Sequence, residues 1–223
     1  MIYWPRKLLI PRFVTLHPTT PTVSGAASLS GFRQAVAAPA AAWMVTFGGI
    51  SVTTPAEELM RRSLAALING RATPILIPVH ERPELKAITL PGTGGTSTHD
   101  DDTTHDDGTG YATGVAAAII VGAVALGAVV MTIRVISGPA LVPGQHITIG
   151  LRLYRISTVE AVSGADQTVT FWPPARDDIG DGADVITDEL ALKVRLADDR
   201  GLAMAAERGR FGQITLGFIE DPS

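Results

Sequence analysis

The sequence contains no cysteine among its 223 residues, and this absence excludes several kinds of site. Disulfide bridges, thiolate zinc centres, iron–sulfur clusters and cysteine nucleophiles are all ruled out. Aromatic residues are also scarce, at 5% of the chain, whereas apolar residues of all kinds make up 46%. Alanine and β-branched residues supply much of that apolar content, so we expect a core built mainly from small and branched side chains.

The chain also lacks an excess of basic residues. Lysine and arginine number 18 against 22 aspartates and glutamates, for a net charge of -4. A general nucleic-acid binder carries a basic stripe or a basic excess, so that class is excluded and no nucleic-acid contact is required. Five of the acidic residues lie between Asp100 and Asp107; without them the balance is 18 basic to 17 acidic residues, or +1. The body of the protein is therefore expected to be nearly neutral.

No hydrophobic run is long enough to predict a membrane span. The longest candidate, residues 115–131, is uncharged but covers 17 residues, and a spanning helix needs about 20. Its many β-branched residues favour strands, and Gly122 and Gly127 mark a turn between two buried strands. Pro5 and Pro11 interrupt the N-terminal segment, so we expect no signal peptide there.

One segment is typical of a helix. Thr54 is a good N-cap, Pro55 suits the first helical position, and Glu57 completes a capping box. Apolar residues then recur at helical spacing, namely Leu59, Met60, Leu64, Leu67 and Ile68. Gly70 is expected as the left-handed C-cap, and Arg61 and Arg62 are expected on a solvent-facing side.

The rest of the sequence is typical of strands and turns. Strands are predicted at 43–51, 75–79, 129–136, 146–149, 151–159, 168–172, 190–196 and 213–220. Prolines bound the strand at 75–79, which favours an edge position. Turns are predicted at 142–145, where Pro143 and Gly144 suit a type II turn, and at 163–166. Short strands at this spacing predict a small β-barrel or β-sandwich.

The predicted fold is therefore mostly β (α+β), a β-sandwich or sheet with one α-helix and an inserted small β-barrel. Residues 1–92 and 189–223 would form the sheet-and-helix domain, and residues 114–188 the inserted barrel. Residues 93–113 would form an acidic loop rich in glycine and threonine between them.

That loop holds the strongest candidates for chemistry. Aspartate and histidine together suit transition metals, so a metal site is one hypothesis, with His99, Asp100, Asp102, His105 and Asp106 as candidate ligands. The spacing does not fit an EF-hand, which would need glycine at the position of His105 and glutamate at that of Tyr111. The alternatives are a solvated acidic loop, or an electrostatic contact with a partner.

Elsewhere the residues predict no catalytic or cofactor-binding site and no cofactor. The sequence has no nucleophile elbow, phosphate loop or zincin motif. A second acidic segment could supply a glycosidase-like carboxylate pair, but its glycines favour a turn; it contains Asp177, Asp178, Asp181 and Asp184. The histidines at 17, 80 and 146 are interpreted as structural or surface residues, and Trp4, Trp43 and Trp172 as core anchors rather than sugar-stacking residues.

An ordered set of segments resembles the tail-tip proteins of long-tailed bacteriophages and prophages, of the distal tail protein kind. The set comprises residues 29–34 followed by Trp43, the helix at 57–70, the loop at 99–111, and the stretches at 141–156 and 169–176. The loop is more acidic than its counterpart in that family. The resemblance covers roughly residues 28 to 220 and rests on order and spacing rather than on one motif.

The resemblance implies a structural virion protein and not an enzyme. It implies a ring, expected to be a homohexamer, that joins the tail tube to the hub, the tail fibres and the receptor-binding apparatus. The expected location is the virion tail tip, after synthesis in the bacterial cytoplasm. Three alternatives stay open: a tube or hub subunit, a metal-dependent enzyme built on the Asp/His loop, and a monomeric binding module that uses the barrel.

Overall fold

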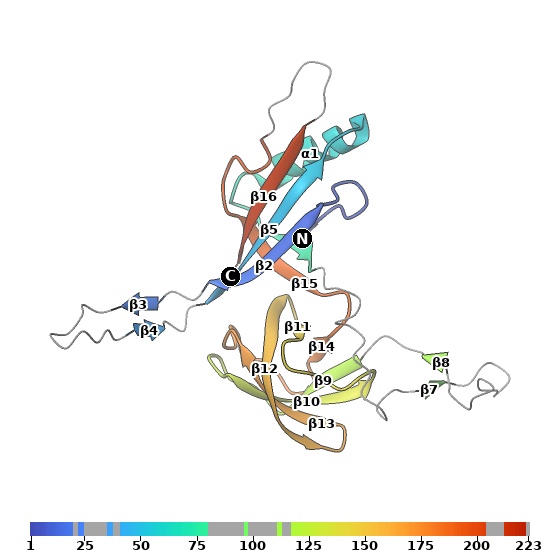
Figure 1. The fold of residues 1–223 in the computed structure, drawn as a ribbon, viewed down its shortest axis with the longest axis vertical. Coiled ribbons are helices and arrows are strands. Elements are labelled where there is room, and N and C mark those ends of the chain that lie inside the picture. The colour runs from blue at the N-terminus through green and yellow to red at the C-terminus, as the bar shows by residue number, and fades with distance from the viewer. Residues whose placement is uncertain are drawn as a thin grey trace. The chain divides into compact units, whose positions relative to one another are not determined.

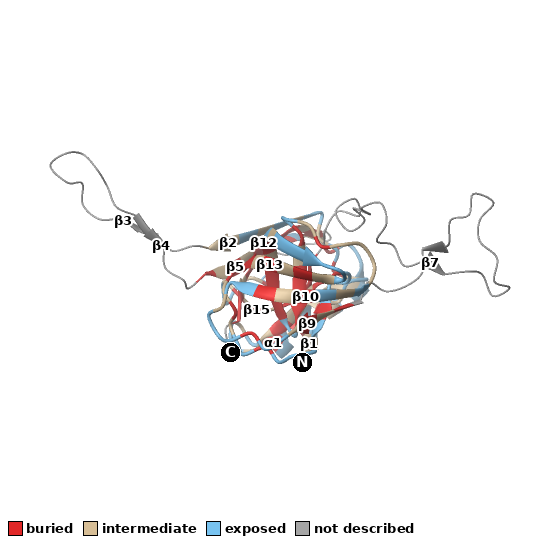
Figure 2. Ribbon diagram, turned by 90° about the horizontal axis from the view of Figure 1, so that it is seen from below, coloured by how far each residue is buried: buried red, intermediate tan, exposed pale blue. Residues whose placement is uncertain are grey.

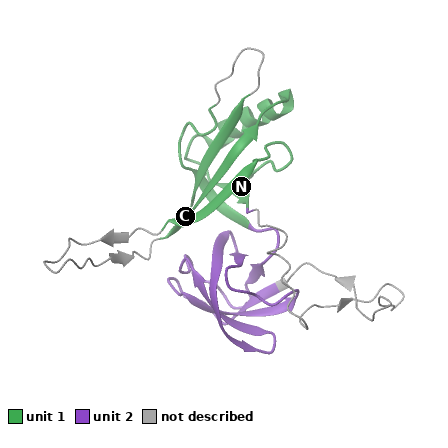
Figure 3. Ribbon diagram, in the orientation of Figure 1, with its two compact units in different colours: residues 1–78, 191–223 green, residues 79–190 purple. Residues whose placement is uncertain are grey.

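A computed structural model of the chain describes residues 1–19, 22–24, 35–37, 41–79, 96–97, 111–112, 117–203 and 212–221. It consists of two compact units, which are Met1–Pro78 with Ala191–Ser223, and Val79–Leu190 (Figure 3). The second unit is inserted into the first between two paired strands, because Pro78 lies opposite Ala191 in the sheet. The sequence analysis set these boundaries at 92 and 189; in the structure they fall at 78 and 191.

The predicted fold class is confirmed: the structure is mostly β, with one helix among the described residues. The first unit contains a six-stranded sheet in the order β1-β6-β15-β16-β5-β2, antiparallel except for the pairing of β1 with β6 (Figure 1). Its strands are β1 (Ile2–Tyr3), β2 (Phe13–Thr19), β5 (Ala42–Ser51), β6 (Ile75–Pro78), β15 (Ala191–Leu196) and β16 (Gln213–Glu220). Two short pairs lie outside the main sheets, β3 (Thr22–Ser24) with β4 (Ala35–Ala37), and β7 (Thr96–Ser97) with β8 (Tyr111–Ala112).

Helix α1 (Pro55–Ile68) begins with the predicted capping box. The Thr54 hydroxyl accepts from the Glu57 N–H at 3.3 Å, and the Glu57 carboxylate accepts from the Thr54 N–H at 2.9 Å. At the other end, Asn69 is the C-cap, in the left-handed conformation with φ 50°, which asparagine tolerates better than most residues. Gly70, predicted to be left-handed at this end, is left-handed too and follows the C-cap, with φ 66°.

The predicted burial of α1 is correct only in part. Leu64 and Ile68 are buried, whereas Leu59 and Leu67 are 65% and 58% exposed. Arg62 is exposed as expected, but the Arg61 side chain is only 12% exposed. Its guanidinium donates to the Glu58 carboxylate and to the backbone carbonyl of Leu202, so both of its polar edges are satisfied away from water.

Strand β5 runs through the Gly48-Gly49 pair without ending. At this pair the register between β5 and β16 shifts: the three residue-to-residue steps from Phe47 to Ile50 span the same length as the two from Ile214 to Leu216. This is a β-bulge, and Gly49 takes a positive φ of 65° that a glycine accommodates without strain. The aromatic core packs beside it, where the rings of Trp4, Phe47 and Phe218 make three edge-to-face contacts at centroid distances of 5.2 to 5.8 Å.

The strand at 75–79, predicted at an edge, does not lie at an edge of the sheet. β6 lies between β1 and β15, and β16 lies between β15 and β5. The edge position was predicted for β6 because of its prolines, and this prediction was wrong. The Val79 N–H donates to the Leu190 carbonyl, toward β15. Because backbone groups alternate in direction along a strand, the nitrogen of Pro78 points to the opposite side, toward β1. β1 pairs only with Ile75 and Leu76, so no partner strand needs an N–H from Pro78. The true edges of the main sheet are β1, which is two residues long, and β2.

The second unit contains a closed barrel of six antiparallel strands in the order β10-β13-β12-β11-β14-β9. The strands are β9 (Ala117–Val121), β10 (Val130–Ser137), β11 (His146–Ile149), β12 (Arg152–Ser163), β13 (Asp166–Trp172) and β14 (Asp184–Ile186). Closure leaves no unpaired edge along the barrel wall. Buried residues alternate with less buried ones along β13, where Gln167, Val169 and Phe171 are buried. Figure 2 colours the buried residues of the structure red.

Both predicted turns of this unit are confirmed. The Gln145 N–H donates to the Val142 carbonyl at 3.2 Å, and Gly144 has φ 89°, as a type II turn requires. The hairpin between β12 and β13 turns at Gly164, with φ 64°. Within the part of the chain that the structure describes, no helix is both long and apolar enough to cross a membrane.

Candidate functional site

The proposed metal ligands His99, Asp100, Asp102, His105 and Asp106 lie outside the described residues. Only the flanking pair of short strands, β7 and β8, is described in this loop. Among the residues that are described, no group of three or more histidines, aspartates or glutamates is arranged to hold a metal ion. The metal hypothesis therefore has no support from the described parts of the chain.

The second acidic segment has a structural part in the barrel. Asp178 accepts from the Leu126 N–H at 2.8 Å, and Asp181 accepts from the Gly122 N–H at 2.7 Å. Asp177 pairs with the Arg152 guanidinium at 3.2 Å. The first two bonds tie the segment 177–181 to the loop that follows β9, and the third ties it to β12. The carboxylates thus cap backbone groups and balance a buried arginine, rather than facing one another across a cleft.

The described histidines and tryptophans lie on strands or in the core. His17 is exposed on β2 and His146 is half-buried on β11, while His80 lies outside the described residues. Trp4 and Trp43 are 4% and 1% exposed, so their interpretation as core anchors is confirmed. The Trp4 ring nitrogen donates to the Leu9 carbonyl at 2.9 Å. Trp172 is half-buried near the end of β13.

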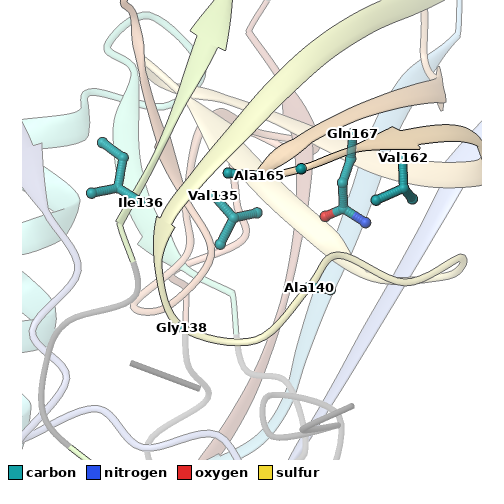
Figure 4. Close-up of a pocket in the computed structure, with 8 residues that line it drawn as sticks. Val135, Ile136, Gly138, Ala140, Val162, Ala165 and Gln167 are labelled. Atoms are coloured by element: carbon teal, nitrogen blue, oxygen red, sulfur yellow. The ribbon is translucent and has the colours of Figure 1, made fainter. Parts of the chain in front are cut away.

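A cavity of about 270 Å³ opens at the barrel, beside the β12–β13 hairpin (Figure 4). Its lining is apolar apart from one amide; the residues are Val135, Ile136, Gly138, Ala140, Val162, Gly164, Ala165 and Gln167. The Gln167 side chain is committed, because it accepts from the Leu141 N–H at 2.8 Å and donates to the Leu141 carbonyl at 3.3 Å. None of these eight residues is acidic, basic or nucleophilic, so the cavity offers no acid–base chemistry.

Among the residues that the structure describes, no strand pairs with the outer side of β2, so its backbone edge is open there. The Trp43 N–H donates to the Glu220 carboxylate at 3.0 Å, toward β16. The N–H and C=O of one strand residue point to the same side, so Pro18, which lies opposite Trp43, directs its backbone away from β5. By the same alternation, Val14 and Leu16 direct their N–H and C=O groups outward. An edge of this kind is a template for pairing with another strand.

Exposed apolar side chains also lie at two places where a loop meets a strand. In the first unit, Ile10 is 62% and Phe13 is 55% exposed. In the second unit, Leu126 is 65% exposed, and Val129 and Val130 are each 43% exposed. Residues 115–131 were predicted as two buried strands with a turn marked by Gly122 and Gly127. β9 and the start of β10 are strands as predicted, and both glycines lie in the connection between them, with φ 80° and 81°. Large exposed apolar side chains gathered in this way are typical of interaction surfaces.

The two units carry opposite charge. The first unit has 12 basic and 7 acidic residues, a net charge of +5, and the second has 6 basic and 15 acidic residues, a net charge of -9. The first carboxylate in the sequence is Glu57, so the N-terminal segment carries only positive charge. Without the five aspartates at 100–107 the second unit still carries -4. The body of the protein is therefore polarised rather than neutral throughout.

Comparison with known proteins adds no family to these observations. A scan against models of protein families finds no match for this chain, and a search of curated proteins finds none either.

Proposed function

We propose that this protein is a structural subunit of the tail tip of a long-tailed bacteriophage, of the distal tail protein kind. It forms a ring, a hexamer in this proposal, that joins the tail tube to the hub, the tail fibres and the receptor-binding apparatus. It acts in the virion after synthesis in the bacterial cytoplasm. It has no catalytic activity and needs no cofactor.

The open edge of β2 is the observation that carries the proposal. A ring subunit needs a surface that another copy can join without unfolding, and an unpaired strand edge offers backbone donors and acceptors for this. The outward N–H groups of Val14 and Leu16 lie on a seven-residue strand. The opposite edge, β1, has two residues and makes a poor template. The asymmetry between the edges suits a head-to-tail contact, which uses a different surface on each side of the subunit.

The apolar lining of the barrel cavity and the structural engagement of Asp177, Asp178 and Asp181 also fit a subunit without catalysis. The enzyme alternative rests on the Asp/His loop alone. Alanine at His99, Asp102, His105 and Asp106 together should leave assembly unchanged if the protein is a ring subunit. Loss of assembly in this variant, with the fold retained by circular dichroism, would contradict this expectation and would place the loop in the contact between subunits.

Electron microscopy of negatively stained protein tests the proposal directly. Rings with a central opening are expected from the purified chain, and antibodies against it should label the tail tip of the parent phage. Labelling of the capsid, of the tail shaft or of no virion component would overturn the assignment.

A further inference from the structure

We infer that the exposed loop of the barrel docks onto the N-terminal segment of a second copy of this chain. This inference rests on the proposed ring and names the two surfaces that meet in it. The N-terminal patch consists of Arg6, Lys7, Ile10, Arg12 and Phe13, all exposed. The barrel patch consists of Leu126, Val129 and Val130 with the carboxylates of Asp178 and Asp181.

The N-terminal patch is held in place by buried anchors. The Trp4 indole donates to the Leu9 carbonyl at 2.9 Å, and the Arg12 N–H donates to the Gly48 carbonyl at 2.9 Å. The Phe13 ring lies over Gly48, so closely that a Cβ there would come within 1.9 Å of it. The backbone that carries these apolar and cationic side chains is therefore fixed, which lowers the entropy lost when a partner binds.

The barrel patch is equally constrained. Asp181 and Asp178 hold the N–H groups of Gly122 and Leu126 near the two ends of the loop. Between them, Val124 pairs with Ile179 in an isolated bridge and turns its side chain inward, with 6% exposed. The exposed Leu126 side chain thus stands on a loop fixed at three points. The same two carboxylates that fix the loop place negative charge beside its apolar surface.

The charges of the two patches are opposite in sign and therefore complementary. The N-terminal patch has three cationic side chains and the barrel patch two carboxylates. Arg134, which lies close enough to act electrostatically on Asp181, is itself paired with Asp166 at 2.6 Å. Each patch combines apolar area with charge of one sign, so the barrel patch of one copy is matched to the N-terminal patch of the next. Such a pairing disfavours contacts between two N-terminal patches or between two barrel patches, because these carry like charges. The copies therefore associate head to tail.

The absence of cysteine makes a clean crosslinking test possible. Two single variants, Ile10→Cys and Leu126→Cys, are purified, one with an affinity tag that changes its mass, then mixed and mildly oxidised. Only a contact between copies yields the mixed disulfide dimer. Leu59→Cys is the matched control for Ile10→Cys, because Leu59 is 65% exposed and belongs to the same unit.

We expect the mixed dimer of Ile10→Cys with Leu126→Cys to form at least tenfold faster than that of Leu59→Cys with Leu126→Cys. Its rate should fall severalfold in 1 M salt, where charges are screened within about 3 Å. Equal rates for the two pairs would overturn the inference. So would a double variant, Ile10→Cys with Leu126→Cys, that closes only a disulfide within one chain.

The mass of the wild-type assembly separates the two proposals. A ring without the selective crosslink overturns this contact and leaves the proposed ring standing. A selective crosslink in a protein that never exceeds a monomer in mass supports the contact and overturns self-assembly of the isolated chain.

Discussion

The carboxylate of Glu220 accepts a hydrogen bond from the backbone N–H of Trp43 at 3.0 Å, across 177 positions of sequence. The side chain of the last strand thereby takes the place of a backbone acceptor at the end of the β5–β16 ladder. The bond also shows that the Trp43 backbone N–H faces β16. This determines which residues of β2 direct their backbone groups toward β5 and which direct them outward. The outward direction of the Val14 and Leu16 backbone follows from this one contact.

The open edge predicts a difference between two neighbouring proline substitutions. Val14→Pro removes an outward N–H and should abolish assembly while costing only about 1 kcal/mol of monomer stability. Thr15→Pro removes an N–H that faces β5 and should destabilise the fold by on the order of 1–3 kcal/mol. Sedimentation velocity and denaturant unfolding of both variants check this. Full assembly by a folded Val14→Pro protein would rule out pairing along β2.

Gly48 is expected to control the N-terminal patch. In Gly48→Ala the new methyl group meets the Phe13 ring, with ring atoms 1.9 to 2.5 Å from the Cβ position. The ring is 55% exposed and is free to swing outward, so the stability loss should stay below about 1 kcal/mol. The crosslinking rate between Ile10→Cys and Leu126→Cys should nevertheless fall severalfold. Adding Phe13→Ala to Gly48→Ala removes the clash without restoring the apolar contact, and should leave the rate low.

The buried carboxylate of Asp221 is expected to be important for stability. Its side chain is 2% exposed and pairs with the Arg195 guanidinium at 3.0 Å and the Lys193 ammonium at 3.3 Å. Asp221→Asn leaves that positive charge uncompensated, and should cost about 3 kcal/mol of unfolding free energy. Urea unfolding measures the loss. Asp166→Asn, which breaks the exposed pair with Arg134, is the control and should have a much smaller effect.

Glu58 is expected to give α1 a pH-dependent stability. Hydrogen bonds from Arg61, and then the neighbouring Arg62, lower the pKa of this carboxyl from 4.5 to about 2. A lowered pKa stabilises the folded state above the unfolded-state value, and the contribution is lost as the pH falls from 4.5 toward 2. Glu58→Gln should therefore lower Tm by roughly 2 °C at pH 7. At pH 2 the difference between the two proteins should largely disappear; a difference that stays constant across this range would contradict the account.

The sequence predicted those elements whose signals are local. The capping box at Thr54 and Glu57, the turn at Pro143 and Gly144, and the alternation along β15 all depend on a few neighbouring residues. The last strand, β16, was predicted with its observed bounds. Each of these elements is recognisable from contacts between residues close in sequence or from a strict alternation of apolar and polar residues, so no knowledge of distant partners was required.

Strand order and surface exposure were not predictable in the same way. β2 was missed because His17 and Pro18 weaken the strand pattern, although Pro18 is tolerated once its nitrogen faces the open edge. Leu126 and Val129 resemble core residues in sequence, and only the backbone hydrogen bonds that Asp178 and Asp181 accept show that their loop is held outside the barrel. The charge polarity of the protein likewise emerges only when the chain is divided into its two units.

The mass of the native assembly tests the central claim most directly. Native mass spectrometry of the purified wild-type chain at micromolar concentration should give one dominant species of about 140 kDa, six times the 23.4 kDa of the subunit. The Val14→Pro variant should give the 23.4 kDa monomer under the same conditions. A wild-type protein that stays at the monomer mass at every concentration would contradict the account of a self-assembling ring.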